Sequence, residues 1–280
     1  MARVLGVSRS GYYAWARRPR REGDPWALLR AEVGRLWEGS EGRFGARSVY
    51  WSLPAGAHAT LYRVRKLMRE LGIQGIHPRS RRRTTVPDPS APSRPDLIRR
   101  DFESAVPTTR LVGDITYLKT GEGWLYLAVV IDLATRMVVG WSMSERMDAR
   151  LAVDALESAR GRGFIAGGAI FHSDRGSQYT SRLLADWARA NDVRLSVGRT
   201  GSCHDNAVAE SFFGTLKNEM WHRRSFATRA EARVAVTGYI EAYYNRRRPH
   251  STIAYKTPAQ AMAEFFERFE RAMREEPAAA

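Results

Sequence analysis

The feature that most constrains the fold is a run of eight consecutive apolar residues, Trp124 to Ile131. The run is far shorter than the roughly 20 apolar residues of a membrane span. Its length and its β-forming side chains therefore predict a strand that is buried at the centre of a sheet. Strands are also predicted on either side of it, over 111–118 and 136–141, with a turn at 121–123. These three strands form an antiparallel meander.

The pattern changes after this meander to alternating helices and strands. Helices are predicted over 148–159 and 181–191, and short strands over 169–172 and 193–197. Three strands followed by alternating elements predict an α/β fold, a mixed five-stranded sheet with helices on its faces. Further helices are predicted towards the C-terminus, over 205–220, 228–244 and 258–275.

The positive charge of the chain is concentrated in its first third. The net charge is +15, from 45 Lys and Arg against 30 Asp and Glu. Residues 1–100 hold 21 basic against 8 acidic residues, residues 101–200 hold 12 against 12, and residues 201–280 hold 12 against 10. We therefore expect the first third to bind a polyanion, with a basic solubilising tail as the weaker alternative. Nucleic acid is favoured over membrane because no long basic amphipathic helix occurs.

Short helices are predicted throughout this basic region. Val4 to Trp15 is typical of the second half of a helix-turn-helix, with Gly6 in the turn and Ser8 as N-cap, although a short basic helix without a DNA role fits equally. The first helix of that motif would need residues before Met1, so we expect either a truncated motif or a polypeptide that begins further upstream. Three more helices, over 27–37, 46–53 and 60–71, fit a small DNA-binding module or a plain helical bundle.

Two further features bound the organisation of the chain. Residues 78–95 contain five of the twelve prolines and several arginines, which is typical of an extended basic linker. Cys203 is the only cysteine, so neither an intramolecular disulfide nor a cysteine-based zinc site is expected. The N-terminus lacks a secretory signal, and we expect a cytoplasmic, nucleoid-associated protein.

Three carboxylates occupy positions where an α/β fold exposes reactive groups. Asp114 lies in the first strand, Asp174 ends the fourth strand, and Glu210 lies in the first turn of a later helix. If the first and fourth strands are adjacent, the three converge on one edge of the sheet. Charges so close would repel unless a divalent cation or a proton neutralised them. All-oxygen ligation favours Mg²⁺ or Mn²⁺, and two ions roughly 3.5–4 Å apart would suit phosphodiester displacement.

The helix that carries Glu210 has a second charged position on the same face. Asp205 and Asn206 precede it as N-cap residues, and Lys217 follows Glu210 by two turns, about 20° away around the axis. A buried stripe is expected at every fourth residue, at Val208, Phe212 and Leu216.

The spacing of these residues is similar to that of a known superfamily. Thirty-five residues separate Asp174 from Glu210, as in the D,D-35-E transposases and retroviral integrases, and Lys217 has the expected place seven positions later. Five motifs in order resemble the catalytic subunit of bacterial insertion sequences of the IS-three family, strongly over 110–260 and more loosely before that. They are G-D-I-T-Y-L (113–118), G-W-L-Y-L-A-V-V-I-D-L (123–133), H-S-D-R-G-S-Q-Y-T-S (172–181), D-N-A-V-A-E-S-F-F-G-T-L-K (205–217) and Y-Y-N-R-R-R-P-H-S-T-I (243–253).

This resemblance implies a ribonuclease-H-like core that nicks DNA at 3′ ends and transfers the strand with the help of divalent metal. The family's catalytic, metal-holding positions map onto Asp114, Asp174 and Glu210. The expected domains are a basic helical DNA-binding region (1–77), a Pro/Arg-rich linker (78–106), the integrase catalytic core (107–222) and a C-terminal helical extension (223–280).

The resemblance also implies partners. The DNA of the element ends and of the target is expected to be bound by a homo-oligomer, and a separate helix-turn-helix protein from an upstream frame is a further candidate. The alternatives are a non-catalytic DNA-binding regulator of a longer fused transposase and, less favoured, a nuclease without strand transfer.

Eight residues are predicted to contact DNA, most of them with a structural alternative, which for the basic cluster 246–250 is a solvated face. His172 is as readily a core histidine, Asn206 is slightly favoured as a helix cap, and Lys217 is either a phosphate ligand or a solvated lysine. Tyr179 is expected along the DNA path or in the core, and Asp132 is expected in a turn rather than as a further metal ligand. The eight residues are His172, Gln178, Asn206, Lys217, Arg246, Arg247, Arg248 and His250.

Overall fold

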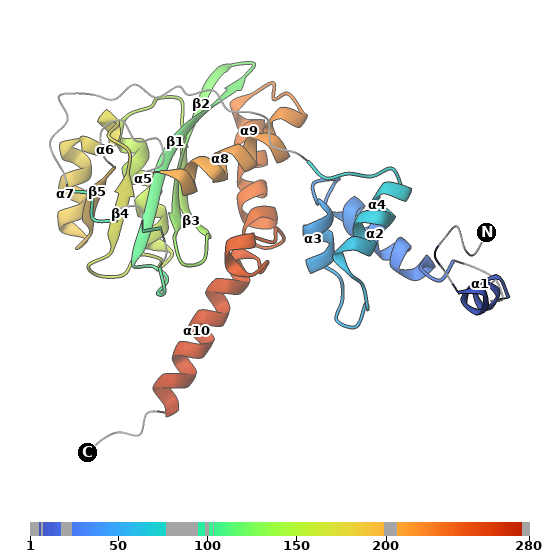
Figure 1. Cartoon of the computed structure of the whole chain (residues 1–280). Helices are drawn as coiled ribbons and strands as arrows, with labels where there is room; N and C mark the ends of the chain where they lie inside the picture. Colours follow the sequence, from blue (N-terminus) through green and yellow to red (C-terminus); the bar gives the residue numbers. More distant parts are fainter. Residues whose placement is uncertain are drawn as a thin grey trace. The chain divides into compact units, whose positions relative to one another are not determined.

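The computed structural model describes residues 6, 8–17, 24–76, 95–98, 101–102, 104–198 and 206–275. The chain divides into two compact units, Met1–Gly75 and Ile76–Ala280 (Figure 1). Among the described helices, none has both the length and the apolar character that a bilayer-spanning helix requires.

The described residues of the N-terminal unit form four helices. Three of them bury a valine side chain completely, namely Val33, Val49 and Val64, and form a small apolar core. Arg65, Lys66 and Arg69 on the last helix are exposed. The helices are α1 (Arg9–Ala16), α2 (Ala27–Gly39), α3 (Ala46–Trp51) and α4 (Leu61–Glu70).

The ends of these helices follow the capping chemistry of the sequence. Ser8 Oγ accepts a hydrogen bond of 3.0 Å from the amide of Gly11 before α1. Thr60 Oγ1 accepts one of 3.2 Å from the amide of Arg63 at the start of α4. Gly72 follows the C-cap residue Leu71 of α4 and has φ +67°, a conformation that glycine adopts without strain. The predicted cap Ser8 is therefore confirmed, and Gly6, predicted in the turn before it, has a positive φ of +64°.

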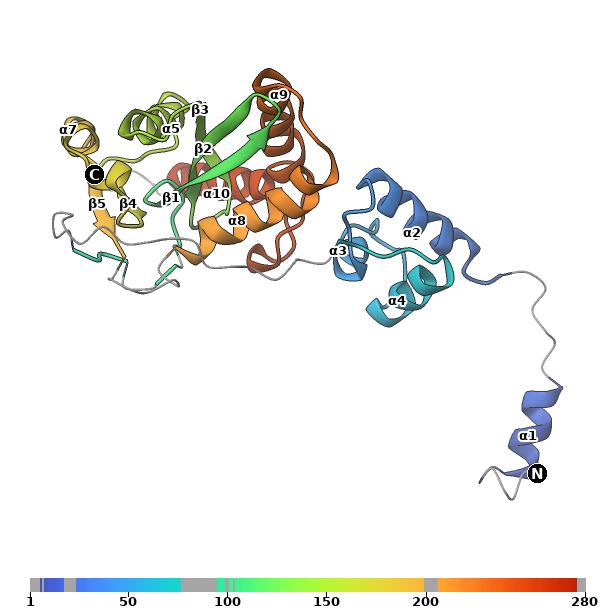
Figure 2. The ribbon, with the colours of Figure 1, turned by 90° about the horizontal axis from the view of Figure 1, so that it is seen from above.

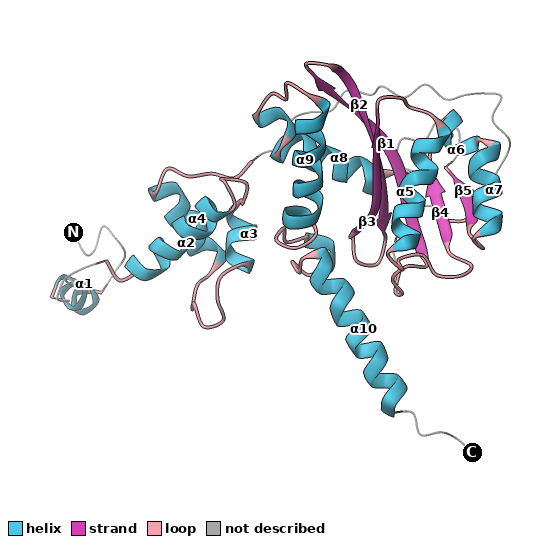
Figure 3. Ribbon diagram, turned by 180° about the vertical axis from the view of Figure 1, so that it is seen from behind, coloured by secondary structure: helices cyan, strands magenta, loops and turns pink. Residues whose placement is uncertain are grey.

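The second unit is built on one mixed five-stranded sheet with the order β3-β2-β1-β4-β5 (Figure 3). The pairs β1–β2 and β2–β3 are antiparallel, whereas β1–β4 and β4–β5 are parallel. The predicted meander and the predicted α/β sheet are confirmed. The strands are β1 (Arg110–Thr120), β2 (Gly123–Asp132), β3 (Val138–Ser144), β4 (Ile170–Ser173) and β5 (Arg194–Val197).

Helices cover both faces of the sheet. On one face lie α5 (Ala149–Gly161) and α7 (Arg182–Ala190), and on the other lies α8 (Ala207–Glu219), as Figure 2 shows. The core on the α5 side joins Leu111, Leu156 and other buried residues. The run 124–131 is buried as predicted, apart from Trp124 and Tyr126 at its start. A short helix, α6 (Ser177–Thr180), was not predicted.

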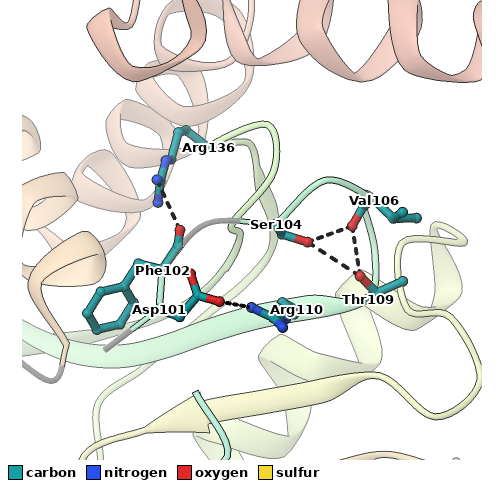
Figure 4. Close-up of polar contacts among 7 residues, drawn as sticks. All are labelled: Asp101, Phe102, Ser104, Val106, Thr109, Arg110 and Arg136. Atoms are coloured by element: carbon teal, nitrogen blue, oxygen red, sulfur yellow. Dashed lines mark hydrogen bonds and ion pairs between the residues drawn. The ribbon is translucent and has the colours of Figure 1, made fainter. Parts of the chain in front are cut away.

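Two segments before β1 pack on the sheet although they belong to the predicted linker. The amide of Leu97 donates a hydrogen bond of 2.9 Å to Ser196 Oγ on β5, and Ile98 is buried. Closer to β1, Arg110 forms an ion pair with Asp101 at 2.9 Å, and Arg136 donates to the carbonyl of Phe102 (Figure 4). The described part of 95–106 is therefore attached to the core because it carries apolar and ionic contacts of its own.

The C-terminal segment packs on α8 and does not form a separate body. After a short 3₁₀ turn, η1 (Trp221–Arg223), come α9 (Arg229–Gly238), the π-helical turn η2 (Tyr239–Tyr244), the 3₁₀ turn η3 (Ser251–Ile253) and α10 (Pro258–Glu275). The ring of Tyr244 contacts Phe212 of α8 edge-on, with centroids 4.8 Å apart. The helix predicted over 228–244 therefore ends as a π-helix, which a 3.6-residue pattern does not indicate.

Candidate active site

Asp114 lies in the middle of the sheet, beside the strand that leads to Asp174. On β1, Val112 pairs with His172 of β4 in parallel register. Two residues further along both strands, the same register brings Asp114 level with Asp174, which follows the last residue of β4. Parallel strands end at the same edge of a sheet, so the two carboxylates of the sequence pattern are neighbours, as the prediction required.

Asn206 attaches the start of α8 to the same place on β1. Its Nδ2 donates a hydrogen bond of 3.1 Å to the carbonyl of Gly113, the residue before Asp114. The amide of Glu210 donates one of 3.1 Å to the carbonyl of Asn206, so Glu210 lies one turn into a helix that is fixed beside Asp114. A methyl group at Gly113 would lie 2.3 Å from the ring of Phe171, so β1 must have glycine here for this packing.

Asn206 occupies the predicted N-cap position of α8, but its side chain does not cap the helix. In the described part of the structure its side chain accepts no hydrogen bond from the first turn of α8, because it is turned towards β1. Asn206 is buried, and its Oδ1 has no hydrogen-bond partner among the described residues. The predicted first cap residue, Asp205, lies outside the described residues.

The electrostatics of Asp114 report the proximity of the other two acids. Burial, and then the negative charge of Asp174, raise the pKa of Asp114 to about 8, and the charge of Glu210 contributes to the same rise. The amide of Ile115, which donates to Asp114 Oδ1 at 2.8 Å, and the charge of Lys217 act in the opposite direction. The surroundings of Asp114 therefore hold too little positive charge to stabilise its ionised form at neutral pH.

Asp174 is also held in a partly apolar environment. Burial raises its pKa, and a hydrogen bond of 3.0 Å from the amide of Gly176 to Oδ1 opposes that shift. Burial, and then the charges of Asp114 and Asp174, raise the pKa of Tyr179 well above its usual value, which indicates that Tyr179 lies close to both aspartates. Tyr179 is buried against Phe171, so the core interpretation holds for it.

The donor set suits a hard divalent cation, although the side chains do not form a closed cage. Among the residues that the structure describes, no three His, Cys, Asp or Glu side chains are grouped closely enough to hold a metal ion. The raised pKa of Asp114 and the unsatisfied Oδ1 of Asn206 nevertheless mark a place that lacks positive charge and hydrogen-bond donors. Oxygen atoms of this kind are ligands that Mg²⁺ and Mn²⁺ prefer.

Lys217 projects from α8 over the end of the β1–β2 hairpin. Its Nζ lies 5.1 Å from the centroid of the Tyr117 ring, and its charge lowers the pKa of Asp114. Glu210 and Lys217 thus share a face of α8, as predicted. Gln178 is half-buried and donates a hydrogen bond of 3.3 Å to the carbonyl of Met147.

His172 is a core residue in this structure, which contradicts its predicted contact with DNA. Its ring is 1% exposed, its Nδ1 lies 2.8 Å from Ser196 Oγ on β5, and Phe102 packs against it edge-on. The alternative of a core histidine therefore holds, because Ser196 of the neighbouring strand β5 and Phe102 of the segment before β1 enclose the ring.

The basic cluster 246–248 divides into two exposed arginines and one structural arginine. Arg246 and Arg247 are exposed and stay candidates for DNA contact. Arg248 Nε donates to both carboxylate oxygens of Glu219, at 3.0 and 3.2 Å, and Tyr239 Oη donates to Oε2 at 2.9 Å. For Arg248 the predicted DNA contact is wrong, because its guanidinium is used within the protein.

His250 also has a local role. Its side chain accepts a hydrogen bond from the amide of Thr252 at the start of η3. Burial, and then the charges of Arg248 and Arg136, lower the pKa of His250 to about 4. The imidazole is therefore neutral at physiological pH and adds no charge for DNA backbone binding.

Sequence reasoning missed the buried residues that hold α8 and β3 in place. Asn245 is 1% exposed and brackets Val138 of β3, since its Oδ1 accepts from the amide and its Nδ2 donates to the carbonyl, both at 3.0 Å. Glu219 and Tyr239 secure the end of α8 through Arg248. The only signal for these contacts was the polar residues amid the buried tyrosines of 239–245.

Models of known protein families match most of the chain. Two models of an integrase core domain match residues 105–203 and 191–258, and a model of an HTH-like domain matches residues 25–81. The HTH-like match therefore lies on α2 to α4, and the segment Val4 to Trp15, predicted as half of such a motif, is outside it.

Curated relatives match nearly the whole length of the chain. The transposase InsF of insertion sequence IS3A from Escherichia coli (strain K12) is 39% identical over 266 residues, which are 93% of this chain and 92% of that protein. The transposase of insertion sequence element IS904 from Lactococcus lactis subsp. lactis (strain IL1403) is 38% identical over 243 residues, 86% and 96% of the two chains.

A solved retroviral structure is a more distant match. The HTLV-2 integrase catalytic core domain in complex with magnesium is similar at a TM-score of 0.44 and 15% identity, over 56% of this chain and 97% of that one. On the strength of the curated relatives and the domain models, the chain belongs to the IS3 family of insertion-sequence transposases, and its catalytic part is an integrase core of the DDE class.

Proposed function

We propose that this transposase cleaves DNA at the 3′ ends of an insertion sequence and transfers the freed ends to target DNA, with Asp114, Asp174 and Glu210 as its catalytic residues. The observation that carries the proposal is the shared electrostatics of three acids from distant parts of the chain. The charges of Asp174 and Glu210 both raise the pKa of Asp114, to about 8. Acids that destabilise one another in this way are typical of a functional site.

Divalent metal is the natural source of the missing positive charge. Asp114, Asp174 and Glu210 would hold Mg²⁺ or Mn²⁺, two ions in the full site, and Asn206 Oδ1 would accept a hydrogen bond from a water molecule beside them. Bound metal would supply Lewis-acid stabilisation of the attacking and leaving oxygens of the phosphodiester. No covalent intermediate with the protein is needed, because positioning and charge neutralisation carry phosphoryl transfer.

The other residues of the site would bind and orient the DNA. Lys217 lies on the same face of α8 as Glu210, where its ammonium group can hold a phosphate next to the bond that is cleaved. Arg246 and Arg247 are exposed and offer two further cations to the DNA backbone. The HTH-like domain carries Arg65, Lys66 and Arg69 on the exposed side of α4, and we assign the recognition of the element ends to it. We further propose that the protein acts on DNA as a homo-oligomer.

The direct test is Asp174→Asn with Mg²⁺, on intact element ends and on ends that are already nicked. Both cleavage and strand transfer should be lost while DNA binding is retained, because the substitution removes a metal-holding charge and no DNA-binding cation. Asp186→Asn is the matched control, since Asp186 is an exposed acid on α7. Undiminished activity of Asp174→Asn would refute the assigned role. Wild-type protein that binds the ends but never cleaves them would instead favour a regulator of a longer transposase.

A further inference from the structure

The last helix, α10, leaves the body of the second unit. Only its first turns join the core, where Met262 is 5% exposed and belongs to the cluster on the α5 side of the sheet. Figures 1 and 3 show the rest of the helix running away from the sheet and from the other helices of this unit. Every residue from 266 to 274 is exposed.

This exposed part of α10 nevertheless has an apolar face. Phe266 is 38% exposed, Phe269 55% and Met273 60%. Their spacing of three and four residues places them on one side of the helix, in line with Met262 in the core. Phe265 stacks on Phe269 with ring centroids 6.3 Å apart, so the apolar stripe is continuous.

Such a stripe is unfavourable in water and is typical of a helix that packs against another surface. Short helices are marginally stable alone and gain most of their stability from the packing of an apolar face. Contiguous apolar surface rimmed by charged residues marks an interaction site. The charged rim of α10 decides which partner fits.

The two edges of the stripe carry opposite charges. With about 100° per residue, Glu267, Glu270 and Arg274 lie along one edge of the stripe and Arg268 lies along the other, so the first edge is net acidic and the second is basic. Two parallel helices related by a twofold axis bring the basic edge of each against the acidic edge of the other, whereas an antiparallel pair brings like edges together. The pair that Glu270 forms with Arg274 at 3.9 Å is highly exposed and contributes little, so Glu270 can change partner.

We propose that α10 pairs in parallel with α10 of a second copy of this chain, through Phe266, Phe269 and Met273. Three partly exposed side chains of this size offer on the order of 300–400 Å² per helix, against about 800 Å² for a stable interface. Pairing is therefore weak in isolation and depends on concentration. It becomes strong when two copies are held on one DNA, because the second contact is then intramolecular. The pairing itself requires neither DNA nor the proposed chemistry.

Cysteine crosslinking tests the parallel arrangement directly in the full-length chain. In a Cys203→Ser background, Met273→Cys places equivalent thiols next to each other across a parallel pair, and mild oxidation should give a covalent dimer. Arg271→Cys is the matched control, because exposed residue 271 lies on the opposite side of the same helix. Equal crosslinking of both variants, or none of Met273→Cys, would overturn the proposal.

Charge reversal tests the edges, by sedimentation equilibrium without DNA or divalent metal. Wild type should show concentration-dependent dimers, Arg268→Glu and Glu270→Arg should each weaken them several-fold, and the double variant should restore them. An antiparallel pair would not be restored by the double variant. If Phe269→Glu lowered the melting temperature without changing the mass, the stripe would be packing within its own chain, and the proposal would be wrong. Because no DNA is present, these outcomes are independent of whether the protein transposes DNA.

Discussion

The two ends of α8 hold glutamates in opposite circumstances. At its start, Glu210 adds to the negative charge around Asp114, whose pKa rises to about 8. At its end, Glu219 receives hydrogen bonds from Arg248 and Tyr239 and is fully partnered although it is buried. The acid at the end of α8 is thus neutralised within the protein, whereas the acid at its start adds negative charge beside another buried acid. The difference separates an acid that stabilises the fold from acids that destabilise one another.

Asp132 shows that burial alone does not make an acid functional. It is completely buried at the end of β2, and burial raises its pKa. Its oxygens, however, accept hydrogen bonds from the amide of Thr108 at 2.7 Å and from the amide and hydroxyl of Thr135 at 2.8 and 2.7 Å. Asp132 therefore belongs with Glu219, as an acid whose demand for donors is met within the protein.

The largest expected effect is that of Glu210→Gln on activity. If Glu210 holds metal, the rate of cleavage and strand transfer should fall by about 10³-fold or more, equivalent to about 4 kcal/mol of transition-state stabilisation. The free energy of unfolding, measured in urea without metal, should stay the same or rise, since a repulsive charge is removed. If Glu210→Gln lowered the free energy of unfolding and left activity unchanged, the distinction between the two ends of α8 would be wrong.

Glu219→Gln should show the reverse pattern. Removing one partner of a buried ion pair leaves the Arg248 guanidinium without its counter-charge, and we expect the free energy of unfolding to fall by about 2–4 kcal/mol. Arg248→Ala should have an effect of similar size in the same urea titration. Arg246→Ala is the control, because an exposed arginine two positions away should change stability by less than about 0.5 kcal/mol.

The pH dependence of stability should separate the acidic site from the rest of the molecule. The folded-state pKa of Asp114, about 8, lies above its ordinary value of 3.8, so the folded protein binds this proton more tightly than the unfolded chain. The stabilisation is complete below pH 3.8 and is lost as the pH rises towards 8. Without metal, wild type should therefore lose stability relative to Asp114→Asn over this range. Mg²⁺ should restore the stability of wild type at pH 8 and leave that of Asp114→Asn unchanged. A difference in melting temperature between the two proteins that stays constant at every pH would contradict the assignment.

The smallest effect is expected for Asn206→Ala. The substitution removes the hydrogen bond to the Gly113 carbonyl, a loss of about 1 kcal/mol, but it also removes a buried oxygen without a partner. Activity should fall more than stability, because the start of α8 would no longer be attached beside Asp114. Asn191→Ala offers a comparison, since that side-chain amide bonds the carbonyl of Trp187 within its own helix and does not attach α8 to β1.

The sequence was sufficient for the sheet, the helices and the acidic positions. The long apolar run at β2, the alternation around it and the spacing from Asp174 to Glu210 are local or ordered signals, and the structure contains the elements that they predicted. The roles of the basic residues were harder to predict. Arg246 and Arg248 are two positions apart in one motif, and only the fold reveals that one faces solvent and the other faces Glu219.

Long-range contacts explain the remaining errors. For His172 the sequence left DNA contact and a core position open, because nothing in the local pattern indicated that Ser196 and Phe102 would enclose it. Asparagine is a residue type that often caps helices, yet the side chain of Asn206 donates its hydrogen bond to the carbonyl of Gly113, 93 residues earlier. In both cases a hydrogen bond to a residue distant in the sequence fixed the role of the side chain.

The π-helical turn η2 makes the length of this segment as important as its composition. The amides of Asn245 and Arg248 bond the carbonyls five residues earlier, Ile240 and Tyr243, so the chain holds more residues here than an α-helix of equal rise. Winding the same residues as an α-helix would rotate those after the turn by about 100°. Asn245 would then face away from β3 and Arg248 away from Glu219. The wider winding of this turn is thus what directs two buried anchors to their partners.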